Sequence, residues 1–482
     1  MSQGLMLLII FAIMLIVMFS GSSVYSSMGV TAILAMLIWM GSRFLQQLQQ
    51  FGISGYSEAS TNENQLIAPM FIMMSEFLSQ GRVAEDIFNV LNRGVGRFKG
   101  GLAISTTLAC TIFAALCGSS PATAASIGRI SIDEMTKRGY APSLAVGTVA
   151  AGGTLGIMIP PSITFCLYGM LTETSIVQLL MAGIIPGLML SALIIISIII
   201  RVRVTPSLLE HLPEDGGYRA ASDISLAEAR DIVGQAKAIA VEEHLGKVAE
   251  KSKKNEEGIA LGPKHVSILT IVPALILIFI VLGSMYLGFA TPIEAAGYGV
   301  IGSLIIVLAQ RRLTKKMFSS VLLNTARTGT MMIFLMICGY IMSYVISYLG
   351  IATSIANTIA DSGLSKYTIL LLMTVLWFIL GCLMDPASML ILTVPFLHPT
   401  LMKVGFSSVH IGVLSVLAAQ IAMITPPVGM NLFVLKANSN LSMSDIIKGS
   451  VPYVLILLLG FVILAAFPEI SLYLPGMMFR VR

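Results

Sequence analysis

Two proline pairs lie inside apolar segments in which a helix would otherwise continue. They occur in "GTLGIMIPPSITFCLYG" (153–169) and in "AMITPPVGMNLF" (422–433). A proline in a helix interior removes an amide hydrogen bond and clashes with the preceding turn, so we expect one helix to stop before Pro160 and another before Pro426. At each break, carbonyl groups without helical partners can bind a cation, and the free amides of the next helix can bind an anion. The predicted chemistry is the binding of ions and of an anionic substrate.

Polar residues also interrupt an apolar run upstream of each proline pair, in "CGSSPATAASIG" (117–128) and in "LMDPASM" (383–389). Hydroxyl, carboxylate and carbonyl oxygens suit hard cations such as sodium. The residues expected to bind ions or substrate are Ser119, Ser120, Thr123, Pro160, Pro161, Ser162, Asp385, Ser388, Thr425, Pro426, Pro427, Gly429 and Asn431. The candidate sodium ligands among them are Ser119, Ser120, Asp385, Thr425 and Gly429.

These residue types can also serve purely structural purposes. Small hydroxyl residues often join helices within membranes. Asp385 lies in an apolar run, where an ionisable residue is a functional candidate, but it could instead cap a hairpin that is exposed to water. Prolines and glycines shape the backbone without touching a ligand. Glu294 in "TPIEAAG" is expected to begin a helix, where a carboxylate favours the positive end of the helix dipole.

The composition predicts an integral membrane protein built from helices. Of 482 residues, 56% are hydrophobic and 11% are charged, which is far more apolar surface than a soluble core can bury. Apolar runs of the length that spans a bilayer recur along the chain, and the first is expected to remain as a span rather than to be a removed signal peptide. The five cysteines lie in apolar segments without a CxxC pair, so we interpret them as packing residues. Neither a metalloenzyme nor a nucleic-acid partner is expected.

The two halves of the chain share one pattern. Gly139 precedes Pro160, and Gly405 precedes Pro426, by the same 21 residues (160 − 139 and 426 − 405). The polar interruption lies upstream of the proline pair at a nearly equal distance in each half. Repeated halves that each contain two broken helices indicate a secondary transporter whose site lies at the repeat interface.

The distribution of Lys and Arg predicts the orientation of these halves, because cytoplasmic loops are enriched in basic residues. The first re-entrant hairpin, 100–137 with its tip at Ser119 and Ser120, is expected to enter from the cytoplasm. The second, 366–403 with its tip at Asp385, is expected to enter from outside, so the repeats are inverted. The bases that place two loops in the cytoplasm are Arg201, Arg203, Lys251, Lys253, Lys254, Lys264, Arg311, Arg312, Lys315 and Lys316.

The expected organisation follows from these features. Residues 1–99 form the first scaffold and arm helices, 100–173 the first transport elements, and 174–204 a spanning helix. Residues 205–264 form a polar cytoplasmic insert, with a helix opened by a capping box of Ser225 and Glu228, which is either a solvated linker or a docking element. Residues 265–365 form the second scaffold and arm helices, 366–437 the second transport elements, and 438–482 a final spanning helix and tail.

Seven motifs along nearly the whole chain are similar to those of one family, the large membrane subunit of tripartite ATP-independent periplasmic (TRAP) transporters. In family order they are "APMFIMMSEFLSQG", "GGLAISTTLACTIFAALCGSSPATAASIG", "GTLGIMIPPSITFCLYGMLTETS", "LMAGIIPG", "GFATPIEAAGYG", "MDPASMLILTVPFLHP" and "ITPPVGMNLF". The insert, 205–264, is longer than the connection usual in the family.

This resemblance implies an elevator-type fold related to the ion transporter superfamily. It also implies a sodium-driven importer of organic acids in the bacterial inner membrane, without a cofactor. The implied partners are a small membrane subunit and a periplasmic substrate-binding protein.

Two other classes of protein share parts of this pattern. A standalone inverted-repeat carboxylate symporter has the same design and differs in needing no binding protein. An intramembrane aspartyl protease needs two aspartates deep in spans, and only Asp385 fits well. A serine type needs a GxSG-like nucleophile, which "CGSSPA" does not match.

Overall fold

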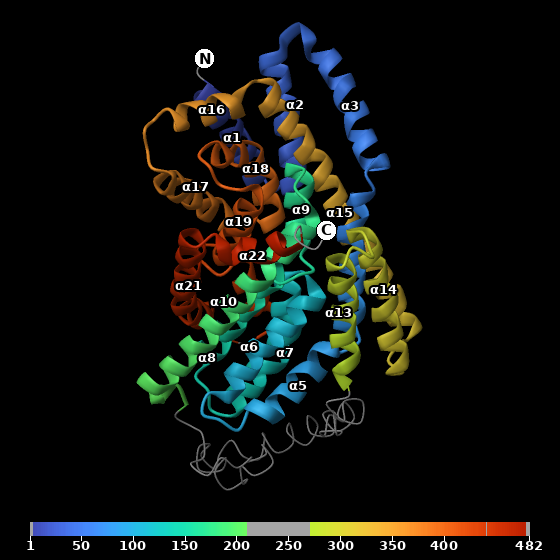
Figure 1. Ribbon diagram of the computed structural model, residues 1–482, viewed down its shortest axis with the longest axis vertical. Helices are drawn as coiled ribbons and strands as arrows, with labels where there is room; N and C mark the ends of the chain where they lie inside the picture. The colour runs from blue at the N-terminus through green and yellow to red at the C-terminus, as the bar shows by residue number, and fades with distance from the viewer. Residues whose placement is uncertain (1–2, 210–269, 440, 479–482) are drawn as a thin grey trace, which may run out of the picture.

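Helices form the regular structure of residues 3–209, 270–439 and 441–478, the part of the chain described by the computed structural model (Figure 1). Within these ranges there is no β-strand. Five of the helical segments there are long and apolar enough to cross a membrane: Val24–Gln50, Ile176–Val204, Pro292–Ala309, Lys315–Tyr348 and Met443–Ala466. The prediction of an all-α polytopic membrane protein is therefore confirmed.

The helices of the first half are α1 (Gln3–Phe19), α2 (Val24–Met40), η1 (Gly41–Arg43), α3 (Phe44–Thr61), η2 (Glu63–Leu66), α4 (Ile67–Gln80), α5 (Val83–Val95), α6 (Gly101–Cys117), α7 (Ser120–Lys137), α8 (Pro142–Thr154), η3 (Leu155–Ile157), α9 (Ile163–Thr172), α10 (Ile176–Val204) and η4 (Pro206–Leu209). Those of the second half are α13 (Val272–Tyr286), α14 (Pro292–Ala309), α15 (Lys315–Tyr348), α16 (Ile351–Ala360), α17 (Lys366–Gly381), α18 (Pro386–Lys403), α19 (Ser408–Ala422), α20 (Met430–Ala437), α21 (Met443–Ala466) and α22 (Glu469–Met478). Of the predicted insert, 205–264, residues 210–264 lie outside the described residues, including its expected capped helix.

The two halves repeat one order of elements. The hairpin α6–α7 and the broken helix α8–α9 correspond to the hairpin α17–α18 and the broken helix α19–α20. The helices before them also correspond, with α15 in the place of α3 and α4 together. The packing has the same symmetry, because α14 contacts α4 and α2 contacts α15.

The repeat extends to the long helices that follow each broken helix. In α10, Pro186 follows Gly183 by three positions, and in α21, Pro452 follows Gly449 by the same number. The sequence predicts these two helices only as spanning segments outside the transport elements. Their matched positions make α10 and α21 the last members of the two repeats.

The two hairpins lie at opposite ends of the molecule. In Figure 1, α6 and α7 are in the lower half of the view, and α17 and α18 are in the upper half. The broken helices connect the two ends, because α8 packs on α6 and α7, α9 contacts α18, and α20 contacts α7. This is the arrangement expected of inverted repeats.

Glycines allow one helix of each half to cross the other at very short range. A Cβ on Gly147 of α8 would lie 2.1 Å from the carbonyl oxygen of Gly449 of α21, and a Cβ on Gly449 would lie 2.3 Å from the oxygen of Ser143. Small residues at such crossings let backbones pack without intervening side chains. The crossing fixes α21, the last spanning helix, against the first broken helix.

Helix α4 contacts the first hairpin through polar side chains. The Ser75 hydroxyl lies 2.9 Å from Cys117 Sγ at the end of α6, and the Ser79 hydroxyl lies 2.9 Å from the Ser126 hydroxyl of α7. The next residue after Ser75, Glu76, accepts a hydrogen bond from Asn324 of α15 at 3.2 Å. Helix α4 therefore joins the hairpin to the second half of the scaffold.

Glu294 begins α14 as predicted. Its carboxylate accepts a hydrogen bond from the Thr291 amide at 2.7 Å, and its own amide donates to the Thr291 hydroxyl at 3.4 Å. This reciprocal pair is a capping box, which satisfies two amides at the start of a helix. The structural role predicted for Glu294 is confirmed.

Candidate functional site

The first hairpin turns within two residues. Helix α6 ends at Cys117, and Gly118 then adopts a left-handed conformation with φ of 66°, which glycine reaches at no steric cost. Ser119 is extended (φ −137°, ψ 124°), and α7 begins at Ser120 with Pro121 in its first turn, where the missing amide donor is not needed. Local sequence therefore sets the turn that the polar motif predicted.

The tip of this hairpin packs directly on the first proline break. The carbonyl of Gly118 accepts a long hydrogen bond, 3.5 Å, from the amide of Ile163, the first residue of α9. A Cβ on Gly118 would lie 2.6 Å from the carbonyl oxygen of Pro161. The two interruptions of the first half, well separated in sequence, are thus one structural unit.

A second glycine brings the other side of the break against the tip. A Cβ on Gly156 of η3 would lie 2.6 Å from the Ser119 carbonyl oxygen and 2.7 Å from Thr123 Oγ1. The Thr123 hydroxyl donates to the Ser119 carbonyl at 2.9 Å. Hydroxyl and carbonyl oxygens therefore gather where the tip meets η3.

Ser162 joins the two sides of the first break. Its hydroxyl donates to the Ile157 carbonyl at 2.6 Å and accepts from the Phe165 amide at 3.2 Å, so it caps α9 and binds a carbonyl that precedes Pro160 and Pro161. Residues 151–170 are all buried. The Pro160–Pro161 and Pro426–Pro427 peptide bonds are both cis.

The second break is more open than the first. Pro427 is exposed and Val428 is 37% exposed. The Thr425 hydroxyl donates to the Ile421 carbonyl of α19 at 2.7 Å. Gly429, with φ of 57°, leads into α20, and a Cβ there would lie 3.0 Å from the Thr425 carbonyl oxygen. The two breaks are equivalent in sequence position but differ in their surroundings.

Asp385 caps the second hairpin. Its carboxylate accepts hydrogen bonds from the amide of Ser388 at 3.1 Å and from the hydroxyl of Ser388 at 2.5 Å. Asp385 is half-buried and Ser388 is 1% exposed. The geometry is that of an N-cap, which was the structural role considered for Asp385, and binding of an ion by this carboxylate stays a prediction.

Asn431 links the second broken helix to the first hairpin. Its side-chain amide donates to the Ser120 hydroxyl at 2.7 Å, and both residues are fully buried. Its backbone amide donates across the second break to the Met423 carbonyl at 3.1 Å. Two predicted site residues from different halves are thereby brought together.

A second link between the halves involves two residues that were not among the predicted site residues. Gln420 of α19 donates its side-chain amide to the hydroxyl of Thr154, the last residue of α8, at 2.8 Å. Thr154 precedes Pro160 by the same number of residues as Gln420 precedes Pro426. This equal spacing from the proline pairs is the signal in the sequence that could have predicted the link.

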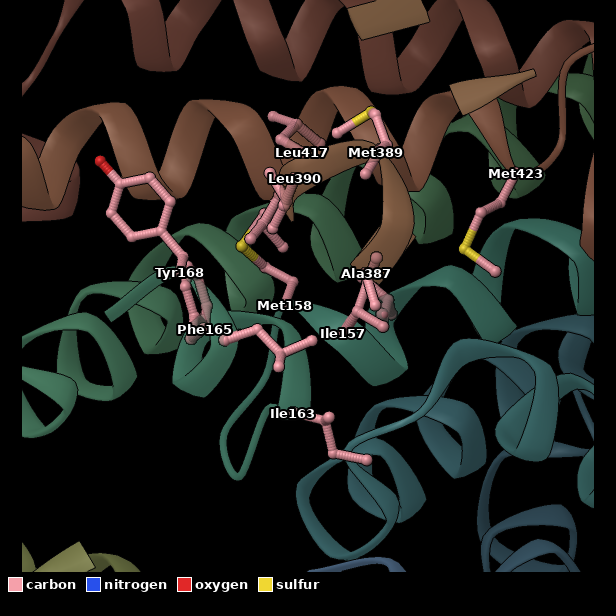
Figure 2. Close-up of a cluster of buried hydrophobic side chains, with 14 of the residues drawn as sticks. Ile157, Met158, Ile163, Phe165, Tyr168, Ala387, Met389, Leu390, Leu417 and Met423 are labelled. Atoms are coloured by element: carbon pink, nitrogen blue, oxygen red, sulfur yellow. The ribbon is translucent and has the colours of Figure 1, made fainter. Parts of the chain in front are cut away.

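Apolar side chains of the second half cover the first break. Figure 2 shows residues of the η3–α9 segment facing residues of α18, α19 and Met423 in one buried cluster. The labelled residues are Ile157, Met158, Ile163, Phe165, Tyr168, Ala387, Met389, Leu390, Leu417 and Met423. Water is therefore kept from this side of the break by the second hairpin and the second broken helix.

The predicted site residues fall into two groups. Ser119, Ser120, Thr123, Pro160, Pro161, Ser162 and Asn431 surround the first tip and break, and we call them the first group. Asp385, Ser388, Thr425, Pro426, Pro427 and Gly429 belong to the second tip and break, and we call them the second group. A Cβ on Gly381 of α17 would lie 2.6 Å from Ala422 Cβ at the end of α19, so the second hairpin packs beside the second break. Within the described ranges, no hydrogen bond joins the Asp385 carboxylate to the first group.

Apolar membrane-spanning helices, together with two halves that each contain a hairpin and a proline-broken helix, define a membrane transport protein. Residues 11–470 match the family described as "Tripartite ATP-independent periplasmic transporter, DctM component", and the chain belongs to this family. Its curated relatives are named as transporter permeases, so the chain is a transport component and not an enzyme.

Several relatives are similar over most of their length. The C4-dicarboxylate TRAP transporter large permease protein DctM of Pseudomonas aeruginosa is 31% identical over 420 residues, which cover 87% of this chain and 88% of the relative. The sialic acid TRAP transporter large permease protein SiaM of Vibrio cholerae is 27% identical and covers 85% of this chain and 86% of its own. The isethionate TRAP transporter permease protein DctMQ of Oleidesulfovibrio alaskensis is 29% identical over 85% of this chain and 57% of its own.

A solved structure has a similar fold. The crystal structure of the Alcanivorax borkumensis YdaH transporter superposes with a TM-score of 0.57 over 90% of each chain, at 15% sequence identity. At this identity the similarity concerns the fold alone. It agrees with the assignment of an all-α polytopic membrane protein.

Proposed function

We propose that this TRAP permease is the large subunit of a sodium-coupled importer of organic acids of the carboxylate or sulfonate type in the bacterial inner membrane. Relatives named for C4-dicarboxylates, sialic acid and isethionate support an acidic substrate, because all three carry an anionic group. The relative named DctMQ supports a second, small membrane subunit as a partner. Family membership supports delivery of the substrate by a periplasmic binding protein.

The observation that carries the proposal is the contact of the first hairpin tip with the first proline break. Gly118 lies against Pro161, and Gly156 lies against Ser119 and Thr123. Hydroxyl and carbonyl oxygens gathered there are suitable ligands for a dehydrated sodium ion. The amino-terminal end of α9, beside them, favours a negative charge. An ion and an acidic substrate can therefore be bound within a short distance of each other.

The second group supplies the other half of the proposed site. Asp385 has a carboxylate, and Thr425 and Gly429 offer carbonyl groups at a break that is partly exposed. Asn431, bonded to Ser120, joins this break to the first group. We propose that one substrate molecule contacts both groups. Uptake of the acid would then require that the sodium ligands of both groups are correctly positioned.

We further propose that the two hairpins and the two broken helices move as one body relative to the scaffold, as in an elevator. The cluster of Figure 2 supports movement as a unit, and the close packing of α8 on α21 implies that α21 moves with this body. The contacts that must then exchange include those of α4, where Ser75 meets Cys117 and Ser79 meets Ser126, and those of α15 with α18.

Uptake by vesicles tests the proposal. The chain would be reconstituted with a small subunit, and labelled organic acids would be offered with and without candidate binding proteins under an imposed sodium or proton gradient. Sodium-driven uptake that requires a binding protein is expected. Uptake without any binding protein would instead favour a standalone carboxylate symporter, and uptake driven only by protons would contradict sodium coupling.

A further inference from the structure

Two buried amide side chains on either side of the second break have the same bonding pattern. Gln420 in α19 and Asn431 in α20 are both 0% exposed. Each donates its NH₂ group to a hydroxyl of the first half, Gln420 to Thr154 and Asn431 to Ser120. The amide oxygens, Gln420 Oε1 and Asn431 Oδ1, accept no hydrogen bond from the described residues. Buried oxygens without a partner are unfavourable and uncommon, so a second interaction is expected of both.

The two hydroxyl partners belong to helix ends that pack on each other. Thr154 ends α8 and Ser120 begins α7. The residue before Thr154, Gly153, is so close to α7 that a Cβ on it would lie 2.7 Å from Ala124 Cβ and 3.2 Å from the Ala124 nitrogen. The hydroxyls are therefore presented from adjoining ends of two helices.

The two amides also belong to helix ends that are bonded to each other. The backbone amide of Asn431 donates to the carbonyl of Met423, which lies about one helical turn beyond Gln420. The ends of α7, α8, α19 and α20 thus form one junction between the halves. The four side chains that form its links, those of Ser120, Thr154, Gln420 and Asn431, carry no charge.

We propose that Gln420 Oε1 and Asn431 Oδ1 are ligands of a monovalent cation bound at this junction, in addition to the sodium ligands proposed at the hairpin tips. The proposal rests on the proposed sodium coupling. Because each NH₂ group is held by a hydroxyl, each oxygen is held in one direction. Neutral oxygens suit a singly charged ion, whereas divalent ions usually recruit carboxylates. When bound, such an ion would join α19 to α20 across the second break.

Sodium-dependent thermal unfolding of the purified full-length protein in detergent tests this site. Sodium chloride would be titrated against choline chloride at constant ionic strength, and the apparent sodium affinity would be taken from the rise in the unfolding midpoint. Gln420→Met removes the ligand oxygen and keeps the length of the side chain. It is expected to raise the apparent dissociation constant for sodium by at least about tenfold. Removing a residue that only hydrogen-bonds to a metal ligand typically weakens metal binding by this much.

Two further variants distinguish a role of Gln420 as a sodium ligand from a role as a structural link between the halves. Thr154→Val removes the hydroxyl but keeps both amide oxygens, so it is expected to weaken sodium binding far less than Gln420→Met does. Gln420→Glu restores an oxygen at the same position and is expected to recover sodium affinity, even where Gln420→Met fails to fold.

The proposal is overturned by equal losses of sodium affinity in Gln420→Met and Thr154→Val, because a mere link between the halves would be lost in both. A lack of recovery in Gln420→Glu also overturns it, as does an unfolding midpoint of the unchanged protein that does not respond to sodium. The proposed function is tested separately by sodium-driven uptake in vesicles, which depends on the sodium ligands proposed at the hairpin tips.

Discussion

At the scale of single residues, the cap formed by Asp385 can be separated from the ion binding proposed for it. As a cap it accepts two hydrogen bonds from Ser388, and an asparagine can accept the same amide bond. As the proposed ion ligand it would supply a negative charge that asparagine lacks. Asp385→Asn is therefore expected to change the free energy of unfolding by less than about 1 kcal/mol and to lower the sodium dependence of uptake strongly.

Vesicle uptake at graded sodium concentrations measures this effect. Glu294→Gln is the matched control, because it removes the charge of a carboxylate that caps α14 and belongs to neither group. An Asp385→Asn protein with an unchanged sodium response would show that Asp385 only caps α18.

A second residue-scale prediction concerns the ion pair of Asp86 and Arg312. Arg312 donates two hydrogen bonds to the carboxylate, at 2.7 Å and 3.1 Å, and a third to the Gly81 carbonyl at 2.7 Å. The Asp86 side chain is 7% exposed and that of Arg312 is 31% exposed. Removing one partner of a buried pair costs about 3–5 kcal/mol, and the exposure of Arg312 reduces this.

We therefore expect Asp86→Asn to destabilise the protein by about 1–3 kcal/mol and to leave the sodium dependence of uptake unchanged. Thermal unfolding in detergent and vesicle uptake measure the two effects. Glu134→Gln is a suitable control, since its pair with Arg138 joins residues four apart at the end of α7 and is more exposed. Equal losses of stability in both variants would contradict the role of the Asp86 pair as a connection between the halves.

Sequence reasoning found part of the candidate site at this scale. The residues of the two tips and breaks stood out because polar residues and prolines are costly in an apolar membrane segment and are seldom placed there without a role. Thr154 and Gln420 did not stand out, because single polar residues in helices are common. Their bond depends on how α8 meets α19, which is tertiary packing that no local pattern encodes.

At the scale of elements, the proline pairs are expected to keep two helices interrupted. Replacing Pro426 and Pro427 by Ala restores two amide donors and removes a helix penalty of about 3 kcal/mol for each proline. We expect the double variant to insert and to resist heat at least as well as the unchanged protein. Its sodium-driven uptake should fall severely, because a helix continued from α19 would close the gap before α20.

Pro399→Ala is the control for this pair. Pro399 lies inside α18, which continues through it, and is exposed. It should leave uptake nearly unchanged. Normal uptake by the Pro426 and Pro427 double variant would mean that the breaks are incidental kinks.

The crossing of α8 and α21 gives a second prediction at this scale. A Cβ on Gly147 would lie 2.1 Å from a backbone oxygen. The two helices must therefore move apart to accommodate a side chain there. Gly147→Ala is expected to destabilise the protein by about 1–3 kcal/mol, as overpacking of a tight contact does. Gly94→Ala in α5 is the control, because no atom lies within 4 Å of a Cβ there, and it should be neutral or slightly stabilising. Thermal unfolding compares the two, and similar midpoints would contradict the close crossing.

The sequence indicated the hairpins and the broken helices, since prolines and glycines mark the ends of helices directly. It did not indicate that α10 and α21 complete the repeats. Their shared Gly and Pro lie inside long apolar helices, where each has an ordinary role in membrane packing. Only the matched order of all the helices made the correspondence visible.

At the scale of the whole molecule, the insert has no counterpart in the repeats and is expected to be dispensable. Its described start, η4, is anchored, because the Leu208 carbonyl accepts a hydrogen bond from the Ala141 amide at 2.9 Å. Replacement of residues 210–262 by a flexible Gly–Ser linker should therefore retain folding and uptake. Vesicle uptake and membrane levels measure this, and loss of uptake at normal levels would assign the insert a part in the transport cycle. Deletion that includes Leu208 is the comparison, and it should lower stability.

Because the surroundings of the two proline breaks differ, the sequence can encode two conformations of the protein. The first break is enclosed and the second is partly open, although both belong to repeats with the same order of helices. If each repeat adopted the conformation of the other, the same sequence would form a second shape that opens the first break and encloses the second. Near-equivalence of the repeats would keep the two shapes close in free energy, so that a bound ion or acid could decide between them. Duplication of one half would thus have supplied a pair of opposite end states without any sequence dedicated to the second.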